Sequence, residues 1–353
     1  MTRWRGPEVL LQKLSEAFGV SGHEGQVRSL ILEEIRDKVD ECRVDAMGNL
    51  IARRKGRGSS SLRVLAAAHM DEVGLLVTQI EDTGLLRFAK VGGIDDRVLP
   101  ARAVFVGDGK VPGVIGSKPV HLTEKAERDK VMDVKQLAID IGASSRGEAE
   151  RLVHRGDYAV FVTDFLELPG LNSWRAVRGK ALDDRVGCAL LMELLGAKLP
   201  FELIAAFTVQ EEVGLRGARV AAYAEDPDAA VVLECTAANE VPNRKDLSAS
   251  TRLGWGPAVT IMDNSFIADK PLVEHFLSIA GRQKIPVQIK QPNIGGTDAG
   301  AIQRTRRGVP AITVAVPARY IHSPAAIMNV ADFDHTQALL AEAMPRLGQA
   351  IRK

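Results

Sequence analysis

Histidine and carboxylate side chains stand at or soon after the ends of four apolar segments in this sequence of 353 residues. The segments read LRVLAAA, LIAAFTV, AAVVL and AITVAV. The side chains that follow them are His69, Asp71, Glu211, Glu212, Glu234 and His322. A further pair, Asp183 and Asp184, stands where a helical pattern begins. Imidazole nitrogen and carboxylate oxygen are ligands that zinc accepts and that cobalt or manganese share, so the sequence predicts a metal site.

Two divalent ions fit this set of side chains if one aspartate is shared between them. With Asp183 as the bridge, one ion takes His69 and Glu234. The other ion takes Glu212 and His322. Three carboxylates leave two dications with one positive charge, which a bridging hydroxide cancels. Such ions, about 3.5–4 Å apart, lower the pKa of the bound water and polarise a carbonyl group.

One glutamate then remains to move a proton. Adjacent residues on an extended chain point in opposite directions, so one of Glu211 and Glu212 faces an ion while the other leans over the water. The spacing alone leaves open which glutamate does which. Asp71 lies two residues after His69 and faces the same side, where its carboxylate can accept a hydrogen bond from the second ring nitrogen.

Several of these residues also have an ordinary structural explanation, although His69 is harder to dismiss because it directly follows an apolar segment. Asp183 or Asp184 can cap a helix, since aspartate is a preferred N-cap residue. The two glutamates can belong to a solvated loop, Asp71 to an exposed turn, and His322 to the surface. These explanations weaken when taken together, because several separate strands would each have to end in a potential ligand by coincidence.

The elements that must position these side chains alternate between strand and helix, which is typical of an α/β fold. The helical stretches DDRVGCALLMELLGAK, GARVAAYAED and PLVEHFLSIAGRQ separate the later apolar segments, and two amphipathic helices are expected at 8–18 and 25–38. The apolar segments lack strict alternation, which indicates a mostly parallel mixed sheet sandwiched by helices. Ligands of such sheets bind beyond the carboxyl ends of the strands.

One segment interrupts this pattern with short strands separated by glycine, aspartate and proline turns. It includes GLLVTQI, LLRFAKV, ARAVFVG, KVPGVIG and DYAVFV, which together favour a small β-barrel. We therefore expect a catalytic domain in two parts, 1–74 and 166–353, and an inserted β-rich dimerisation or assembly domain at 75–165.

The composition narrows the classes of partner. Hydrophobic residues make up 46% and charged residues 26%, and the net charge of +1 gives no reason to expect nucleic acid or an anionic membrane. The three cysteines, Cys42, Cys188 and Cys235, have no spacing typical of a disulfide framework or zinc knuckle. Without an apolar signal segment or membrane span, the expected location is cytoplasmic. Cys188 and Cys235 adjoin the predicted site but have no evident base partner, which favours a buried structural role.

The motifs AHMDEVG, GKALDDRVGCA, TVQEEVGLRGA, LECT and YIHSP resemble, in that order, those of metallopeptidase family 42, the tetrahedral or TET-type aminopeptidases. The likeness spans nearly the whole chain, including LSEAFGVSGHEGQVR, VGGIDDRVLPARAV and GGTDAGAIQ. The resemblance implies a dinuclear metalloaminopeptidase that removes N-terminal residues from short peptides. The ligands it implies are His69, Asp183, Glu212, Glu234 and His322. It makes Glu211 the general base and later the general acid, and Asp71 the residue that orients His69.

The resemblance also implies a homo-oligomer, in which the insertion forms dimers that assemble into a dodecamer with an enclosed chamber. Glu234 departs from the family pattern, because many relatives carry aspartate there, and this leaves the metal preference open. His121 in the insertion can reach a neighbouring subunit's site, although an ordinary surface position is favoured. Thr297 and Asp298 in GGTDAG fit either a substrate site or a structural turn. His23 is expected to be structural, and Glu72 has no assigned role.

Three other functions remain to be compared with the aminopeptidase. A metal-dependent deacylase of small N-acyl substrates would use the same ions. A glycosidase needs two carboxylates astride a sugar and no histidine ligands. A non-catalytic scaffold with structural metals would not need the spare Glu211. The preferred first residue of a peptide substrate is not readable from the sequence.

Overall fold

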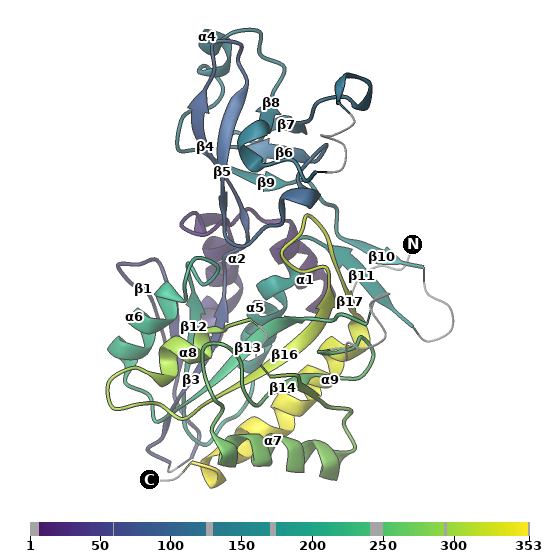
Figure 1. The fold of residues 1–353 in the computed structure, drawn as a ribbon. Coiled ribbons are helices and arrows are strands. Elements are labelled where there is room, and N and C mark those ends of the chain that lie inside the picture. The colour runs from purple at the N-terminus through teal and green to yellow at the C-terminus, as the bar shows by residue number, and fades with distance from the viewer. Residues whose placement is uncertain are drawn as a thin grey trace.

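The computed structural model describes residues 7–58, 60–124, 130–169, 174–240, 250–292 and 295–351. In these ranges the chain forms one large sheet covered by helices, with a closed barrel standing beyond one end of the sheet layer (Figure 1). Among the described helices, none combines the length and the apolar character needed to cross a membrane.

The large sheet is mixed, with a parallel centre and antiparallel flanks. In spatial order its strands are β1 (Glu41–Val44), β2 (Leu50–Arg54), β12 (Glu202–Thr208), β3 (Arg63–His69), β13 (Ala229–Ala237), β16 (Ala311–Arg319), β17 (Ala326–Asn329), β11 (Ala176–Gly179) and β10 (Leu166–Leu168). β14 (Ala258–Thr260) pairs with β16, and β15 (Gln288–Lys290) pairs with β14. The adjacent strands β12, β3, β13 and β16 are parallel, so their carboxyl ends meet at one edge.

Helices cover both faces of this sheet. They are α1 (Pro7–Glu16), α2 (Gly25–Ile35), α5 (Leu182–Leu194), α6 (Arg216–Glu225), α7 (Lys270–Gln283), α8 (Asp298–Gln303) and α9 (Val330–Ala343). Short 3₁₀ turns η1 (Arg36–Lys38) and η5 (Met344–Gln349) extend α2 and α9. Successive residues of β3 face opposite sides: Val64 packs in the core with α1, α2, α5, α7 and α9, whereas Leu65 packs with α6 and α8. The predicted fold class, a helix-covered α/β sheet with an inserted barrel, is confirmed.

The barrel forms from the chain between β3 and β10. Its strands, in order around the closure, are β4 (Gly74–Ile80), β5 (Leu86–Val91), β8 (Ala138–Asp140), β7 (Val111–Gly116), β6 (Ala103–Val106) and β9 (Tyr158–Phe161). The short elements η2 (Asp96–Val98), η3 (Val120–Leu122), η4 (Val134–Gln136) and α4 (Arg146–Ala149) lie in its connections. The barrel has its own apolar core, which is separate from the two cores of the sheet. Only residues 70–73 join β3 to β4, so the turn after His69 links the sheet directly to the barrel.

Candidate metal centre

The parallel register brings the predicted site residues to one edge of the sheet. His69 is the last residue of β3 and pairs with Thr208, the last residue of β12. Val232 of β13 pairs with Ala67, so Glu234 and His69 each lie two residues further along neighbouring strands. The remaining members follow soon after: Glu211 and Glu212 come after β12, His322 comes after β16, and Asp183 lies in the first turn of α5.

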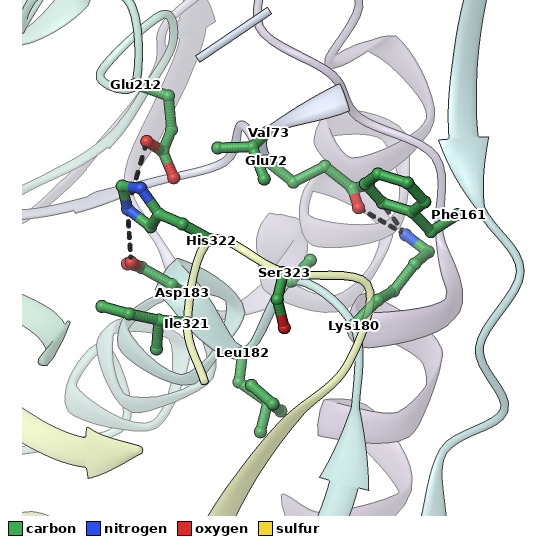
Figure 2. A pocket seen from close by; sticks show the side chains of 12 residues that line it. Glu72, Val73, Phe161, Lys180, Leu182, Asp183, Glu212, Ile321, His322 and Ser323 are labelled. Atoms are coloured by element: carbon green, nitrogen blue, oxygen red, sulfur yellow. Dashed lines mark hydrogen bonds and ion pairs between the residues drawn. The ribbon is translucent and has the colours of Figure 1, made fainter. Parts of the chain in front are cut away.

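Asp183 belongs to two groups of potential metal ligands at once. Its Oδ1 lies 3.4 Å from His69 Nε2, and that nitrogen lies 3.3 Å from Glu234 Oε1. Its Oδ2 lies 3.3 Å from His322 Nε2, which is 3.4 Å from Glu212 Oε2 (Figure 2). Each group offers ligand atoms within 4.8 Å of one another. The structure therefore brings together all five side chains that the sequence predicts as ligands.

Asp184, the alternative to Asp183, has a structural role. Its Oδ1 accepts a hydrogen bond from the backbone N–H of Gly187 at 3.0 Å, which is the spacing of a helix N-cap. Its Oδ2 accepts from the backbone N–H of His69 at 3.2 Å. Asp184 is fully buried and absent from both ligand groups. Of the two roles that the sequence suggested for this pair, the helix N-cap thus applies to Asp184 and the potential metal ligand is Asp183.

Two carboxylate oxygens at the site fit a bound cation. In the described part of the chain, Asp183 Oδ1 and Glu234 Oε2 are buried and have no hydrogen-bond donor. Burial raises the pKa of Glu212 to about 8, and the nearby Asp183 carboxylate contributes. Burial likewise raises the pKa of Glu234 to about 7, against the opposing effect of His69. Crowded, buried carboxylates of this kind need a compensating positive charge.

The two histidines are oriented so that Nε2 faces the carboxylates. His69 Nδ1 lies 3.1 Å from the carbonyl oxygen of Asp71, and His322 Nδ1 lies 3.1 Å from that of Gly93. A carbonyl oxygen only accepts hydrogen bonds, so each Nδ1 carries the proton and donates it, and a neutral ring keeps Nε2 available as a ligand. Burial lowers the pKa of His322, but Asp183 and Glu212 outweigh it and raise the value to about 9, so an ion that binds Nε2 would have to displace a proton from this nitrogen.

Asp71 contacts more than the sequence suggested. Its carboxylate Oδ1 lies 3.5 Å from His69 Nδ1, further than the carbonyl oxygen of the same residue. The carboxylate accepts hydrogen bonds from the backbone N–H groups of Glu211 at 3.0 Å and Glu212 at 3.1 Å. A third donor is the hydroxyl of Ser21, at 2.6 Å. Asp71 therefore ties the strand end that carries His69 to the turn that carries both glutamates.

Glu211 lies outside both ligand groups and lines a cleft of about 370 Å³ beside them. Burial raises the pKa of Glu211 well above its usual value, against the opposing effect of His69. The described residues that line the cleft are Asp183, Glu211, Glu212, Leu215, Glu234, Cys235, Thr236, Ala237, Lys290, Gly295, Gly296, Thr297, Ile321 and His322. The arrangement places a carboxyl group able to hold a proton next to the ligand groups and open to a substrate.

The sequence missed Lys290, the last residue of β15. Its side chain lines the cleft although the residue is only 5% exposed. The one signal for it was its place at the end of a strand that leads into GGTDAG. Thr297 of that motif also lines the cleft, whereas the Asp298 carboxylate turns inward and accepts a hydrogen bond from Thr208 at 2.6 Å.

The structure also shows the surroundings of Glu72, His23 and His121, to which the sequence assigned no part in the chemistry. Glu72 pairs with Lys180 at 2.7 Å next to the ligand groups (Figure 2). Glu72 also pairs with the buried Arg185 at 3.1 Å. His23 lies 2.8 Å from an oxygen of Asp108 and stacks on Tyr158 of the barrel, as expected of a structural residue. His121 is exposed in η3 of the barrel, and its reach to another subunit stays a prediction.

The cysteines near the site are fully or almost fully buried. The Cys188 thiol donates to the carbonyl oxygen of His69 at 3.1 Å, and burial raises its pKa far above the usual range. Burial also raises the pKa of Cys235. A thiol that stays protonated is a poor nucleophile, so both positions fit the structural role expected of them.

Paired imidazole and carboxylate groups on the carboxyl edge of this sheet are the chemistry of a metal-dependent hydrolase. The chain belongs to the M42 glutamyl aminopeptidase family, whose sequence profile matches residues 48–339. The lysyl aminopeptidase of Pyrococcus furiosus is 36% identical over 350 residues, which cover 95% of this chain and 97% of that protein.

Solved structures agree with this membership. A TET aminopeptidase from a marine sediment archaeon of the Thaumarchaeota superposes with a TM-score of 0.92 at 37% identity, covering 98% of each chain. The TET1 peptidase of Pyrococcus horikoshii, which can assemble into a tetrahedron or a large octahedral shell, superposes with a TM-score of 0.84 at 38% identity. That match covers 96% of this chain and 99% of the other. The resemblance noted in the motifs is thereby confirmed.

Proposed function

We propose that this aminopeptidase holds two divalent ions per subunit and removes N-terminal residues from short peptides. His69 and Glu234 would hold one ion, Glu212 and His322 the other, with Asp183 shared. The observation that carries this proposal is the division of Asp183, whose two oxygens each face a different histidine at 3.4 and 3.3 Å. Zinc or cobalt suits a set of two nitrogens and three carboxylates, and manganese is also accommodated.

The ions, when bound, would activate a water molecule and polarise the scissile carbonyl. Glu211 supplies the proton transfers, because its carboxylate lines the cleft next to both ligand groups and its raised pKa suits a group that gains and gives up a proton. It would take the proton of the attacking water and later give it to the departing amine. Asp71 supports this role by holding the main chain of Glu211.

Lys290 supports a preference for an acidic first residue. The family is described as glutamyl aminopeptidases, but one relative is a lysyl aminopeptidase. The preferred first residue of this enzyme's substrates must therefore be inferred from its own cleft. Among the described residues, Lys290 has no hydrogen-bond acceptor or acidic partner. The acids that line the cleft all lie at the end with the metal-ligand groups; they are Asp183, Glu211, Glu212 and Glu234. A substrate carboxylate in the cleft would pair with this ammonium group, whereas a basic side chain would be repelled.

The insertion supports an assembled enzyme. We infer a catalytic domain from 1–74 and 166–353 and an assembly domain from 75–165, because the barrel has a core of its own and one short turn enters it. One solved TET1 structure is a dodecamer, and the TET1 peptidase can assemble into a tetrahedron. By analogy, dimers of this chain would form a dodecamer enclosing the active sites, which would admit only short peptides. The three cysteines are free, which suits a cytoplasmic protein. Sedimentation that gives a stable monomer would contradict the assembly.

The experiment that tests the activity compares aminoacyl p-nitroanilides with their N-acetylated forms. Chelator should abolish hydrolysis of the free-amine substrates, and cobalt or zinc should restore it. Full activity of a metal-free sample would reject the proposal. Release of acetate from the N-acetylated forms, without p-nitroaniline, would favour the deacylase, and chelator-insensitive cleavage of cellulose would favour the glycosidase. Two bound ions without turnover on any substrate would favour the scaffold.

A further inference from the structure

The loop between α1 and α2 lies against the turn that carries Glu211 and Glu212. It pairs with the turn after His69: the backbone N–H of Glu72 donates to Gly19 at 2.8 Å, and Val20 forms a parallel bridge with Glu72. The loop thus runs alongside the strand exit of β3, although about 50 residues separate the two in sequence.

Ser21 of this loop contacts the Asp71 carboxylate. Its hydroxyl donates to Oδ2 at 2.6 Å, and the two residues are 5% and 0% exposed. The same oxygen accepts the backbone N–H of Glu212, and the other accepts that of Glu211. A buried carboxylate with three donors is held in one rotamer, so the hydroxyl of Ser21 fixes the acceptor on which both glutamates depend.

Glu24 contacts the same turn from its other end. Its Oε1 accepts the backbone N–H of Gln210 at 3.2 Å and that of Gly22 at 2.6 Å, and the residue is 4% exposed. Gln210 has a φ of 57°, a left-handed conformation that a side-chain-bearing residue adopts only where its surroundings hold it. Glu24 is therefore placed to hold the residue just before Glu211 in this conformation.

We propose that Ser21 and Glu24 are positioning residues for the reaction, because their hydrogen bonds fix the turn that aims Glu211 at the cleft and Glu212 at His322. This inference rests on the proposed function of those two glutamates. Neither Ser21 nor Glu24 lines the cleft or belongs to a ligand group, so both act through Asp71 and the main chain of Gln210.

The test compares deletion of each hydrogen-bonding group with a variant that keeps it. Ser21→Ala removes the hydroxyl and Ser21→Thr retains it; Glu24→Ala removes the acceptor and Glu24→Gln retains an oxygen there. Ser29→Ala is the matched control, since within the described ranges the Ser29 hydroxyl bonds only to the carbonyl of Gly25, in its own helix α2. The readouts are kcat and KM of the cobalt-loaded enzyme, the affinity of the metal-free protein for cobalt from its visible absorption, and the Tm of the metal-free protein.

The two alanine variants at positions 21 and 24 should lose about 10–100-fold in kcat or cobalt affinity with KM little changed, as expected of groups that orient the ligand shell. The threonine and glutamine variants should recover most of the loss, and Ser29→Ala should match the wild type. Wild-type kcat and cobalt affinity in both alanine variants would overturn the proposal. Equal losses in the alanine and conservative variants would overturn it too, since the hydrogen bonds would then not be responsible.

The experiment still tests the proposal if one variant is unstable or if the wild type is inactive. If Ser21→Ala melts below the assay temperature, the Glu24 pair of variants tests the same turn from its other side. If the wild type has no aminopeptidase activity, the proposed function fails. The cobalt affinities of the Ser21 and Glu24 variants still decide whether the loop positions Glu212 for the ions.

Discussion

The carboxylate of Asp71 accepts a hydrogen bond from the backbone N–H of Glu211 at 3.0 Å. The two residues are 140 positions apart in sequence and follow different strands, β3 and β12. Because β3 and β12 are parallel neighbours, their carboxyl ends come together and a side chain after one reaches the main chain after the other. Asp71 thus links the proposed proton carrier to His69, and the predictions below depend on this arrangement.

Glu211→Gln should abolish most turnover while leaving the bound metal in place. The substitution keeps the shape of the side chain but removes its ability to take a proton, and Glu211 belongs to neither ligand group. We expect kcat to fall about 10²–10⁴-fold, with the metal content measured by elemental analysis unchanged. Glu274→Gln, at an exposed pair with Lys270 on α7, is the control and should have wild-type activity. A kcat close to wild type in Glu211→Gln would assign the proton transfer to another group.

Glu234→Gln and Glu212→Gln should weaken different ions. Glu234 lies 3.3 Å from His69 Nε2 and Glu212 lies 3.4 Å from His322 Nε2, so each substitution removes one negative charge from one group. In a titration of the metal-free protein with cobalt, each variant should lose one of two binding steps, by more than about tenfold in affinity. Glu234→Asp, which keeps the carboxylate, should retain two steps. A single step in the wild type would contradict the shared position of Asp183.

Lys290→Met should remove the preference for an acidic first residue. The ammonium group is expected to bind the substrate carboxylate, a charged hydrogen bond whose loss costs about 10–100-fold. The measurement is the ratio of kcat/KM for glutamyl and glutaminyl p-nitroanilides, which differ only in that charge. Lys290→Glu should reverse the ratio towards lysyl substrates, and exposed Lys198→Met should leave it unchanged. A wild-type ratio near one would contradict the assignment of Lys290.

Asp332 should make the stability of the protein depend on pH between about 4 and 6. Burial raises its pKa to about 6 from 3.8, although the N–H groups of Gly254 and Gly256 bond to it and lower the value. A carboxyl group with a raised pKa binds a proton more tightly in the folded protein than in the unfolded chain. Its contribution is therefore present in full below pH 3.8 and is lost as the pH rises through about 6.

The measurement for Asp332 is the stability difference between the wild type and Asp332→Asn in the metal-free protein. The rise of the Asp332 pKa from 3.8 to about 6 corresponds to about 3 kcal/mol. The free energy of unfolding of the wild type, relative to that of Asp332→Asn, should therefore fall by an amount of this order from pH 4 to pH 7. Comparison with the asparagine variant cancels the titration of the other carboxyl groups. A difference that stays constant over this range would show that the Asp332 pKa is ordinary.

The sequence by itself determined the fold class and the set of side chains at the site. Apolar segments without alternation predict buried strands, and parallel strands bring their carboxyl ends to one edge whatever their distance in sequence. His69, Glu234 and His322 could therefore be grouped from residue type and position alone. The interrupted pattern of short strands likewise predicted the barrel, because turn residues and strand length are local properties.

Only the tertiary structure shows which way the neighbouring acids face. Asp183 and Asp184 are adjacent and chemically identical, and the start of α5 turns one towards the histidines and the other towards its own helix. The same holds for Glu211 and Glu212, whose turn is fixed by Asp71 and by a loop near residue 21. Such directions depend on contacts between segments 50 to 140 residues apart. Spacing and residue type do not determine these directions, because the side-chain geometry exists only once the strands have packed.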